Sequence, residues 1–294
     1  MKYTCMSFNI LGVDEAGKDL YAPSEIRCEC IANYLSEIKS DIVGIQEAGN
    51  HHRLYNWMTN FSQIIEENGL YSVVKMDDEE EFKKTTTTFA DKSVPLSAGL
   101  MILYKRDKFE LIERGAHKYS SDEKQERYFQ WVHLRDKQVA RDIFVTNTHW
   151  SINWDKDGKV SPEAGALHRT KQANELRTFW ENKVGDNILF ATGDYNCRQD
   201  SEWIKLAESG IYKQAGNLGD KDWNLGDHID NIFINPNVAE VEDLRFLDCT
   251  LDTTSVQGRH TGLYFWYSKD KVYDNLRFDR MSDHNPLLLT VNVK

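Results

Sequence analysis

Six apolar stretches of this chain begin or end in short clusters of Asn, Gln, Glu, Asp and His, and this repetition constrains the fold more than any other feature. The clusters are Asn9, Gln46-Glu47, Asn147–His149, Gly193–Asn196, Asp230 and Ser282–His284. In α/β proteins, ligands bind at strand ends, on loops that a rigid sheet holds in place. We therefore expect these polar side chains to meet at one rim of the molecule.

Strand-like and helix-like periodicities alternate along the chain. Strands are predicted over residues 3–10, 41–46, 71–76, 99–104, 109–114, 128–134, 139–149, 187–192, 228–234, 241–247 and 286–293. Helices are predicted over residues 24–39, 52–67, 163–182 and 201–209. This order predicts an α/β fold in which two sheets pack face to face with helices outside. No Pro/Gly/Ser-rich linker divides the chain, so residues 1–294 are expected to form one catalytic domain.

Charge and composition limit the function further. The chain has 36 Lys+Arg and 47 Asp+Glu, a net charge of −11, which argues against binding to nucleic acid through the net field. The acidic and lysine-rich run at 77–84 and the Thr85–Thr88 tract are expected to form one exposed loop. Nothing in the sequence indicates an obligate protein partner.

The five cysteines fit neither a disulfide framework nor a zinc site. We expect buried free thiols. No stretch of about 18 apolar residues occurs, which predicts no membrane span. The beginning of the chain lacks a signal peptide, so a cytoplasmic location is expected.

The carboxylates of the clusters indicate a metal. Glu47, Asp194, Asp230 and Asp283 supply oxygen atoms, which suit a hard cation such as Mg²⁺ rather than zinc. Mn²⁺ is expected to substitute for Mg²⁺.

The remaining polar residues complete a set suited to phosphate chemistry. His149 and His284 stabilise charge or move protons near neutral pH, and Asn9 and Asn196 orient oxygen atoms without adding charge. Hydrolysis of a phosphate ester needs a cation, a base for water and donors for the leaving oxygen.

The motifs together resemble those of the endonuclease/exonuclease/phosphatase superfamily. They are SFNI around Asn9, DIVGIQE ending at Glu47, SAGLMILYKRDKFEL (Ser97–Leu111), Thr148-His149, GDYN (Gly193–Asn196), HIDNIFI (His228–Ile234) and SDHNPL (Ser282–Leu287). The resemblance covers nearly the whole chain. It implies a DNase I-like four-layer α/β sandwich with two central mixed sheets, and Mg²⁺-dependent hydrolysis of a phosphate ester.

The resemblance also implies roles for single residues. The implied metal-site residues are Asn9, Glu47 and Asp283. The implied catalytic residues are His149 on the scissile phosphate, Asp194 on the attacking water, Asn196 on phosphate, and His284 oriented by Asp230. The implied substrate-binding residues are Tyr104, Arg127 and Trp150.

The substrate stays open between a nucleic acid, a nucleotide and a phospholipid-type head group. Trp150 and Trp154 follow His149, where they are expected either to stack on a base or sugar or to pack on the body of the protein. A phosphodiester hydrolase is the first hypothesis. The alternatives are a nuclease acting on DNA or RNA ends and a non-catalytic phosphate-ligand-binding protein that kept the fold.

Overall fold

The computed structural model of this chain describes residues 1–11, 24–48, 55–76, 86–89, 92–95, 99–120, 127–153, 157, 159–198, 200–208, 211–217, 229–248, 282 and 284–294. Asp283, Trp154 and Cys249 lie outside the described residues. In the described part of the chain, no helix combines the length and the apolar character needed to cross a membrane.

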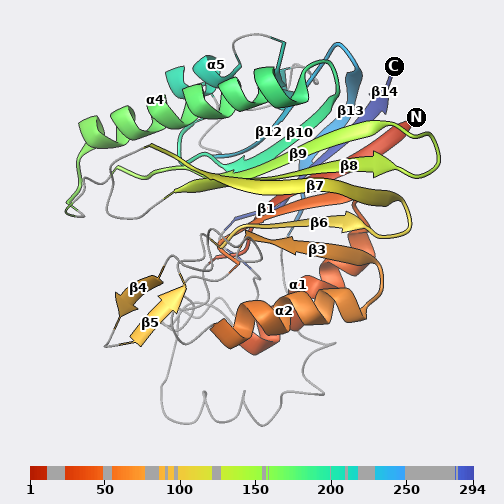
Figure 1. The fold of residues 1–294 in the computed structure, drawn as a ribbon, viewed down its shortest axis with the longest axis horizontal. Coiled ribbons are helices and arrows are strands. Elements are labelled where there is room, and N and C mark those ends of the chain that lie inside the picture. The colour runs from red at the N-terminus through yellow and green to blue at the C-terminus, as the bar shows by residue number, and fades with distance from the viewer. Residues whose placement is uncertain are drawn as a thin grey trace.

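The first sheet contains six strands in the order β13-β14-β1-β2-β6-β3. The strands are β1 (Lys2–Asn9), β2 (Ile42–Gln46), β3 (Tyr71–Lys75), β6 (Met101–Lys105), β13 (Ala239–Phe246) and β14 (Leu287–Val293). Strands β1 and β2 are parallel, and helix α1 (Ser24–Ile38) connects them because a parallel pair needs a crossover. Helices α1 and α2 (Tyr55–Glu67) cover the outer face of this sheet (Figure 1).

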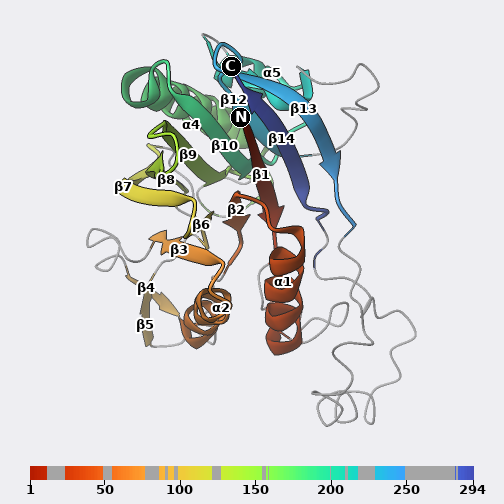
Figure 2. The same cartoon turned by 90° about the vertical axis from the view of Figure 1, so that its right-hand side faces the viewer.

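The second sheet also has six strands, in the order β11-β12-β10-β9-β8-β7. The strands are β7 (Phe109–Lys118), β8 (Tyr128–Asp136), β9 (Asp142–His149), β10 (Ile188–Asp194), β11 (Lys213–Gln214) and β12 (Asp230–Ile234). Its parallel pair is β9 and β10, which α4 (Pro162–Phe179) connects. Helices α4 and α5 (Glu202–Ala207) cover the outer face, on the opposite side of the molecule from α1 and α2 (Figure 2).

Local sequence explains where α4 begins and ends. The Ser161 side chain accepts a hydrogen bond from the backbone N–H of Ala164, and Pro162 occupies the first turn. A π-helical segment, η3 (Trp180–Val184), continues the helix to Gly185, whose φ of 57° is the left-handed conformation that glycine tolerates. The predicted helix 163–182 therefore divides into an α-helical and a π-helical part.

Apolar side chains fill three layers, and these confirm the four-layer α/β sandwich. One layer lies between α1, α2 and the first sheet, one between the two sheets, and one between the second sheet and α4, α5. The four cysteines in the described residues are buried, as expected.

The inward faces of the central strands change from apolar to polar along their length. In chain order these residues are Tyr3, Cys5, Ser7 and Asn9 on β1; Ile143, Val145, Asn147 and His149 on β9; and Ile188, Phe190, Thr192 and Asp194 on β10. Because alternate residues of a strand face the same side, each strand brings its last polar residue to one edge of the space between the sheets.

One prediction about a loop is wrong in part. Thr86–Phe89 forms strand β4, which pairs with β5 (Lys92–Pro95) in a two-stranded antiparallel sheet. The physical reason is that threonine is β-branched and favours extended backbone, which outweighs its polarity here. Residues 77–85 lie outside the described residues.

Candidate active site

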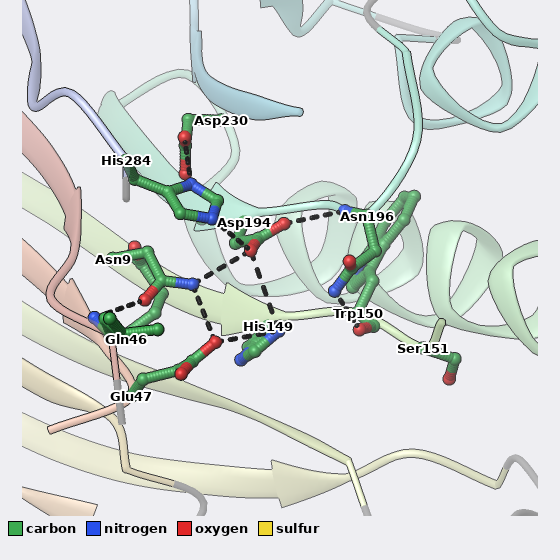
Figure 3. A network of polar contacts seen from close by, with 12 residues as sticks. Asn9, Gln46, Glu47, His149, Trp150, Ser151, Asp194, Asn196, Asp230 and His284 are labelled. Atoms are coloured by element: carbon green, nitrogen blue, oxygen red, sulfur yellow. Dashed lines mark hydrogen bonds and ion pairs between the residues drawn. The ribbon is translucent and has the colours of Figure 1, made fainter. Parts of the chain in front are cut away.

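Asn9 joins the two sheets at the polar edge. It ends β1, and its Nδ2 donates to Glu47 Oε1 at 2.9 Å and to Asp194 Oδ2 at 3.0 Å (Figure 3). Its Oδ1 accepts from the backbone N–H of Leu11 at 3.0 Å. The Asn9 amide N–H groups thus hold two carboxylates together, and its metal ligation stays a prediction.

Glu47 directly follows β2 and supplies the most exposed carboxylate of the group. Its side chain is 26% exposed, whereas that of Asp194 is 2% exposed. The backbone of Glu47 has φ 58°, a left-handed conformation that costs free energy for a residue with a Cβ. Such conformations persist where the surrounding structure imposes them, often at functional sites.

Asp194 stands at the centre of the cluster, at the end of β10. Its Oδ2 lies 3.7 Å from His149 Nε2 and 3.9 Å from His284 Nε2, and its Oδ1 accepts from the backbone N–H of Asn196 at 2.9 Å. Burial raises the pKa of Asp194, and the charge of His149 opposes that rise. The site thus holds a carboxylate that two imidazoles face.

His149 ends β9 beside Asp194 in the parallel register. Burial lowers the pKa of His149, and the positive charge of Arg127 lowers it further, against the opposing charges of Asp194 and Glu47. Arg127 is itself buried just before β8. Arg127 therefore lies within electrostatic reach of His149.

His284 is held by the carboxylate expected for it. Its Nδ1 lies 2.7 Å from Asp230 Oδ2, and its Nε2 is directed toward Asp194 (Figure 3). Ser282 ties this segment to β1, because its hydroxyl donates to the carbonyl of Asn9 at 2.7 Å and accepts from the backbone N–H of His284 at 3.2 Å. The contact to Asp230 orients the imidazole.

Asn196 connects the ends of the two parallel strands β9 and β10. Its Nδ2 donates to the carbonyl of Trp150 at 2.9 Å, and the backbone N–H of Trp150 donates to the carbonyl of Asp194 at 2.8 Å. Asn196 has φ 48°, a conformation that asparagine tolerates better than most residues.

The structure corrects the role of Trp150. Its side chain is fully buried, its Nε1 donates to Tyr119 Oη at 3.2 Å, and its ring meets Tyr195 edge-on at 4.7 Å. A ring without exposed surface cannot stack on a substrate. Trp150 supports the site through its backbone and its packing instead.

The structure also corrects the role of Tyr104. Its side chain belongs to the apolar layer between the sheets. On antiparallel β6 it pairs with Ile42, at the opposite end of β2 from Glu47, whereas Met101 pairs with Ile45 near that residue. Tyr104 therefore lies away from the polar edge and packs in the core.

Replacing Trp150 with Ala is expected to destabilise the protein by roughly 3–5 kcal/mol, the usual cost of emptying a buried tryptophan site. Urea unfolding measures this loss, and activity toward large and small substrates should fall together as folded protein is lost. Unchanged unfolding with a raised KM for a base-containing substrate alone would restore the stacking role.

Among the residues that the structure describes, two groups of side chains could hold a cation. Glu47, His149 and Asp194 each offer a ligand atom within 4.8 Å of the others, and Asp194, Asp230 and His284 do the same. Glu47 is the member that combines a charge with exposure, and oxygen donors suit Mg²⁺. The carboxylates of the two groups fit a divalent metal ion.

The sequence as a whole matches a known family. The sequence model described as "Endonuclease/Exonuclease/phosphatase family" matches residues 6–284. The chain belongs to this family. Members of the endonuclease/exonuclease/phosphatase family are hydrolases that act on phosphoester bonds, and the family generally uses a divalent metal.

Solved structures of family members share the fold at low sequence identity. An endonuclease/exonuclease/phosphatase from Bacteroides vulgatus has a TM-score of 0.65 at 17% identity, with 100% of both chains covered. The human Nocturnin catalytic domain with bound sulfate has a TM-score of 0.66 at 15% identity, with 100% of this chain and 95% of that chain covered. A mannosyl-6-phosphatase from Bacteroides thetaiotaomicron has a TM-score of 0.66 at 17% identity, with 99% of both chains covered. No curated protein sequence matches significantly.

The sequence patterns did not single out Ser7 and Thr192 beneath the site, and they placed Asn147 in a polar cluster without giving it a role. Ser7, Asn147 and Thr192 are fully buried. Their positions in the strands could have indicated them. Each is a polar residue that faces inward on a strand whose earlier inward-facing residues are apolar.

Proposed function

We propose that this chain is a Mg²⁺-dependent phosphoesterase, and specifically a phosphodiester hydrolase. The observation that carries the proposal is the buried Asp194 carboxylate, which lies between two imidazoles and shares the Asn9 amide with Glu47. Glu47 would hold the cation, together with Asp283, which lies outside the described residues. Mg²⁺, when bound, would neutralise the charge of the substrate phosphate.

The residues of the chain would divide the remaining work. Asp194 would align the attacking water and take its proton, since burial raises the pKa of this carboxyl and makes it a better base. His149 and Arg127 would donate to the phosphate oxygens, and Asn196 would assist them. His284, oriented by Asp230, would stabilise the charge that develops in the transition state.

Chelator-sensitive hydrolysis tests the proposal. The purified protein is incubated with a small chromogenic phosphodiester and Mg²⁺, then with EDTA, then with Mn²⁺ added back. We expect hydrolysis with Mg²⁺, none with EDTA and recovery with Mn²⁺. Hydrolysis that persists in EDTA would contradict the metal. Phosphate-ester binding without hydrolysis would favour a non-catalytic binding protein.

A substrate screen separates the remaining alternatives. Single-stranded DNA, RNA, abasic duplex, phosphoinositides, sphingomyelin and tyrosyl-DNA are each incubated with Mg²⁺ and the protein. Preferred cleavage at DNA or RNA ends would assign a nuclease. The Asp194→Asn variant, purified in parallel, excludes a contaminating hydrolase.

Replacing Asp230 with Asn is expected to lower kcat by about 10–100-fold with little change in KM. The amide keeps the size of the side chain but removes the charge that orients His284, and partners of this kind usually contribute that much. Steady-state kinetics with the small diester measure it. An unchanged kcat would show that the Asp230–His284 contact serves the fold alone.

A further inference from the structure

A layer of buried amide and hydroxyl groups connects the two sheets directly beneath the site. Asn147 on β9 is its centre. Asn147 Nδ2 donates to the carbonyls of Ile45 at 2.7 Å and Met101 at 3.0 Å, both in the other sheet. Asn147 Oδ1 accepts from Gln46 Nε2 at 2.6 Å and from Thr192 Oγ1 at 3.2 Å. The Asn147 side chain thus donates two hydrogen bonds and accepts two, and its partners lie on three strands in both sheets.

Ser7 adds a second connection at the same level. Its hydroxyl accepts from the backbone N–H of Gly193 at 3.1 Å and from Gln46 Nε2 at 3.3 Å. Ser7, Gln46, Asn147 and Thr192 all have 0% exposure. Because buried polar groups are costly unless paired, a layer in which they pair with one another favours one relative placement of the sheets. We call these four residues the inter-sheet clamp.

Each clamp residue lies one or two positions from a site residue. Gln46 immediately precedes Glu47, Asn147 is two residues before His149 on the same face of β9, and Thr192 is two residues before Asp194 on the same face of β10. A shift of one sheet against the other would separate Glu47 from His149 and Asp194, because they come from different sheets.

Gly44 shows how closely the sheets approach at the clamp. A Cβ on Gly44 would lie 1.9 Å from Thr192 Oγ1 and 2.9 Å from Asn147 Oδ1. Both distances are shorter than a carbon atom allows, so this approach requires glycine.

We propose that Gln46, Asn147 and Thr192 are positioning residues that set the distance between the cation-binding carboxylate of one sheet and the water- and phosphate-directed groups of the other. This inference rests on the proposed function. The clamp residues touch neither cation nor substrate; they act through the strand ends to which they belong.

Two mild variants test the clamp without emptying the core. Gln46→Met removes the amide donor to Asn147. Thr192→Val removes the second donor, a hydroxyl that lies 3.2 Å from Asn147 Oδ1 and 3.1 Å from the Thr146 carbonyl, while keeping the shape of the side chain. We expect kcat to fall about 10–100-fold in each variant, the usual effect of losing a residue that orients a metal ligand. Mn²⁺ affinity, measured by calorimetry on the metal-free protein, should also fall about 10–100-fold. The substrate KM should stay within about twofold. Thr192→Ser retains the hydroxyl and should restore both quantities.

Thr146→Val is the matched control. Its hydroxyl accepts from Trp180 Nε1 at 3.2 Å on the opposite face of the same strand, so the variant also loses one buried hydrogen bond. We expect a comparable loss in unfolding free energy with kcat and Mn²⁺ affinity unchanged. If the clamp variants behave like Thr146→Val while the wild type is active, the clamp serves stability alone and the inference is overturned. A wild type that neither hydrolyses phosphate esters nor binds Mn²⁺ overturns the proposed function and the clamp with it.

Discussion

Replacing Asp194 with Asn is expected to lower kcat roughly 10²–10⁴-fold, the range for loss of a positioned general base. The substitution keeps the acceptor for the Asn196 N–H. It places an NH₂ group where Asp194 Oδ2 accepts from Asn9 Nδ2, so two donors face each other. The variant therefore loses both the base and its orientation. Steady-state kinetics with a small phosphodiester measure the loss.

Asp142→Asn is the matched control for this substitution. Asp142 lies at the other end of β9 from His149, with its carboxylate bound to Arg135. It should leave kcat unchanged. An Asp194→Asn variant that keeps wild-type turnover would remove Asp194 from the proposed chemistry.

Although Asp194→Asn should lower activity, it should make the metal-free protein progressively more stable relative to the wild type as pH rises. Burial raises the pKa of Asp194 in the folded protein, so its contribution to stability is fully present below the unfolded pKa of about 3.9 and is lost as pH rises through the folded pKa. The neutral amide has no such loss. The metal-free variant should therefore gain stability relative to the wild type as pH increases, which thermal unfolding at several pH values measures.

The effects of Asp194 and His284 should not add. His284→Ala alone is expected to cost several orders of magnitude, because His284 Nε2 is directed at Asp194 Oδ2 and both groups would act on one transition state. The double variant should be close to the worse single variant. A loss equal to the product of the two single losses would argue against a shared site.

Replacing Glu47 with Gln is expected to lower metal-dependent activity by several orders of magnitude. A bound cation contributes several kcal/mol to the transition state, which corresponds to roughly 10²–10⁴-fold in rate. Glu47 is 26% exposed at the rim and does not fill the core, so the free energy of unfolding should change little. Calorimetry with Mn²⁺ should show the same loss of affinity that the kinetics show at limiting Mg²⁺.

Glu113→Gln serves as the control for Glu47. Glu113 is an exposed carboxylate on β7 whose partner is Lys183, so the variant removes a negative charge that is not part of the site. It should keep wild-type kinetics and metal affinity. Near wild-type activity of Glu47→Gln at limiting Mg²⁺ would instead assign the cation to other residues.

The alternation of apolar and polar residues was sufficient to predict most of the strands and the types of residue at their ends. Residues 3–10 alternate with period two and form β1, which ends at Asn9. Period-two patterning is a local property, so it can be predicted without knowledge of the partner strand. The order of the motifs then identified the family.

The predicted substrate-binding roles of Trp150 and Tyr104 were wrong because they depend on contacts between segments that are distant in the sequence. Trp150 follows His149 by one residue, so it points to the other face of the sheet, but only the packing of the layer beneath α4 shows that this face is closed. Tyr104 faces inward like the site residues. The antiparallel direction of β6 places it at the far end from Glu47, and strand direction is a property of the whole sheet.

The clamp shows the same division between local pattern and long-range contact. The sequence marks Ser7, Asn147 and Thr192 as polar residues on strands, and it can predict which way each side chain points. Their partners lie as far as 186 residues apart along the chain, as between Ser7 and Gly193. Such a pairing depends on how the two sheets approach each other. The first sheet combines strands from the beginning and the end of the chain, and the second sheet is built from the middle of the chain. The identity of the site residues is therefore a property of the sequence, whereas their mutual distances arise only when the two sheets pack.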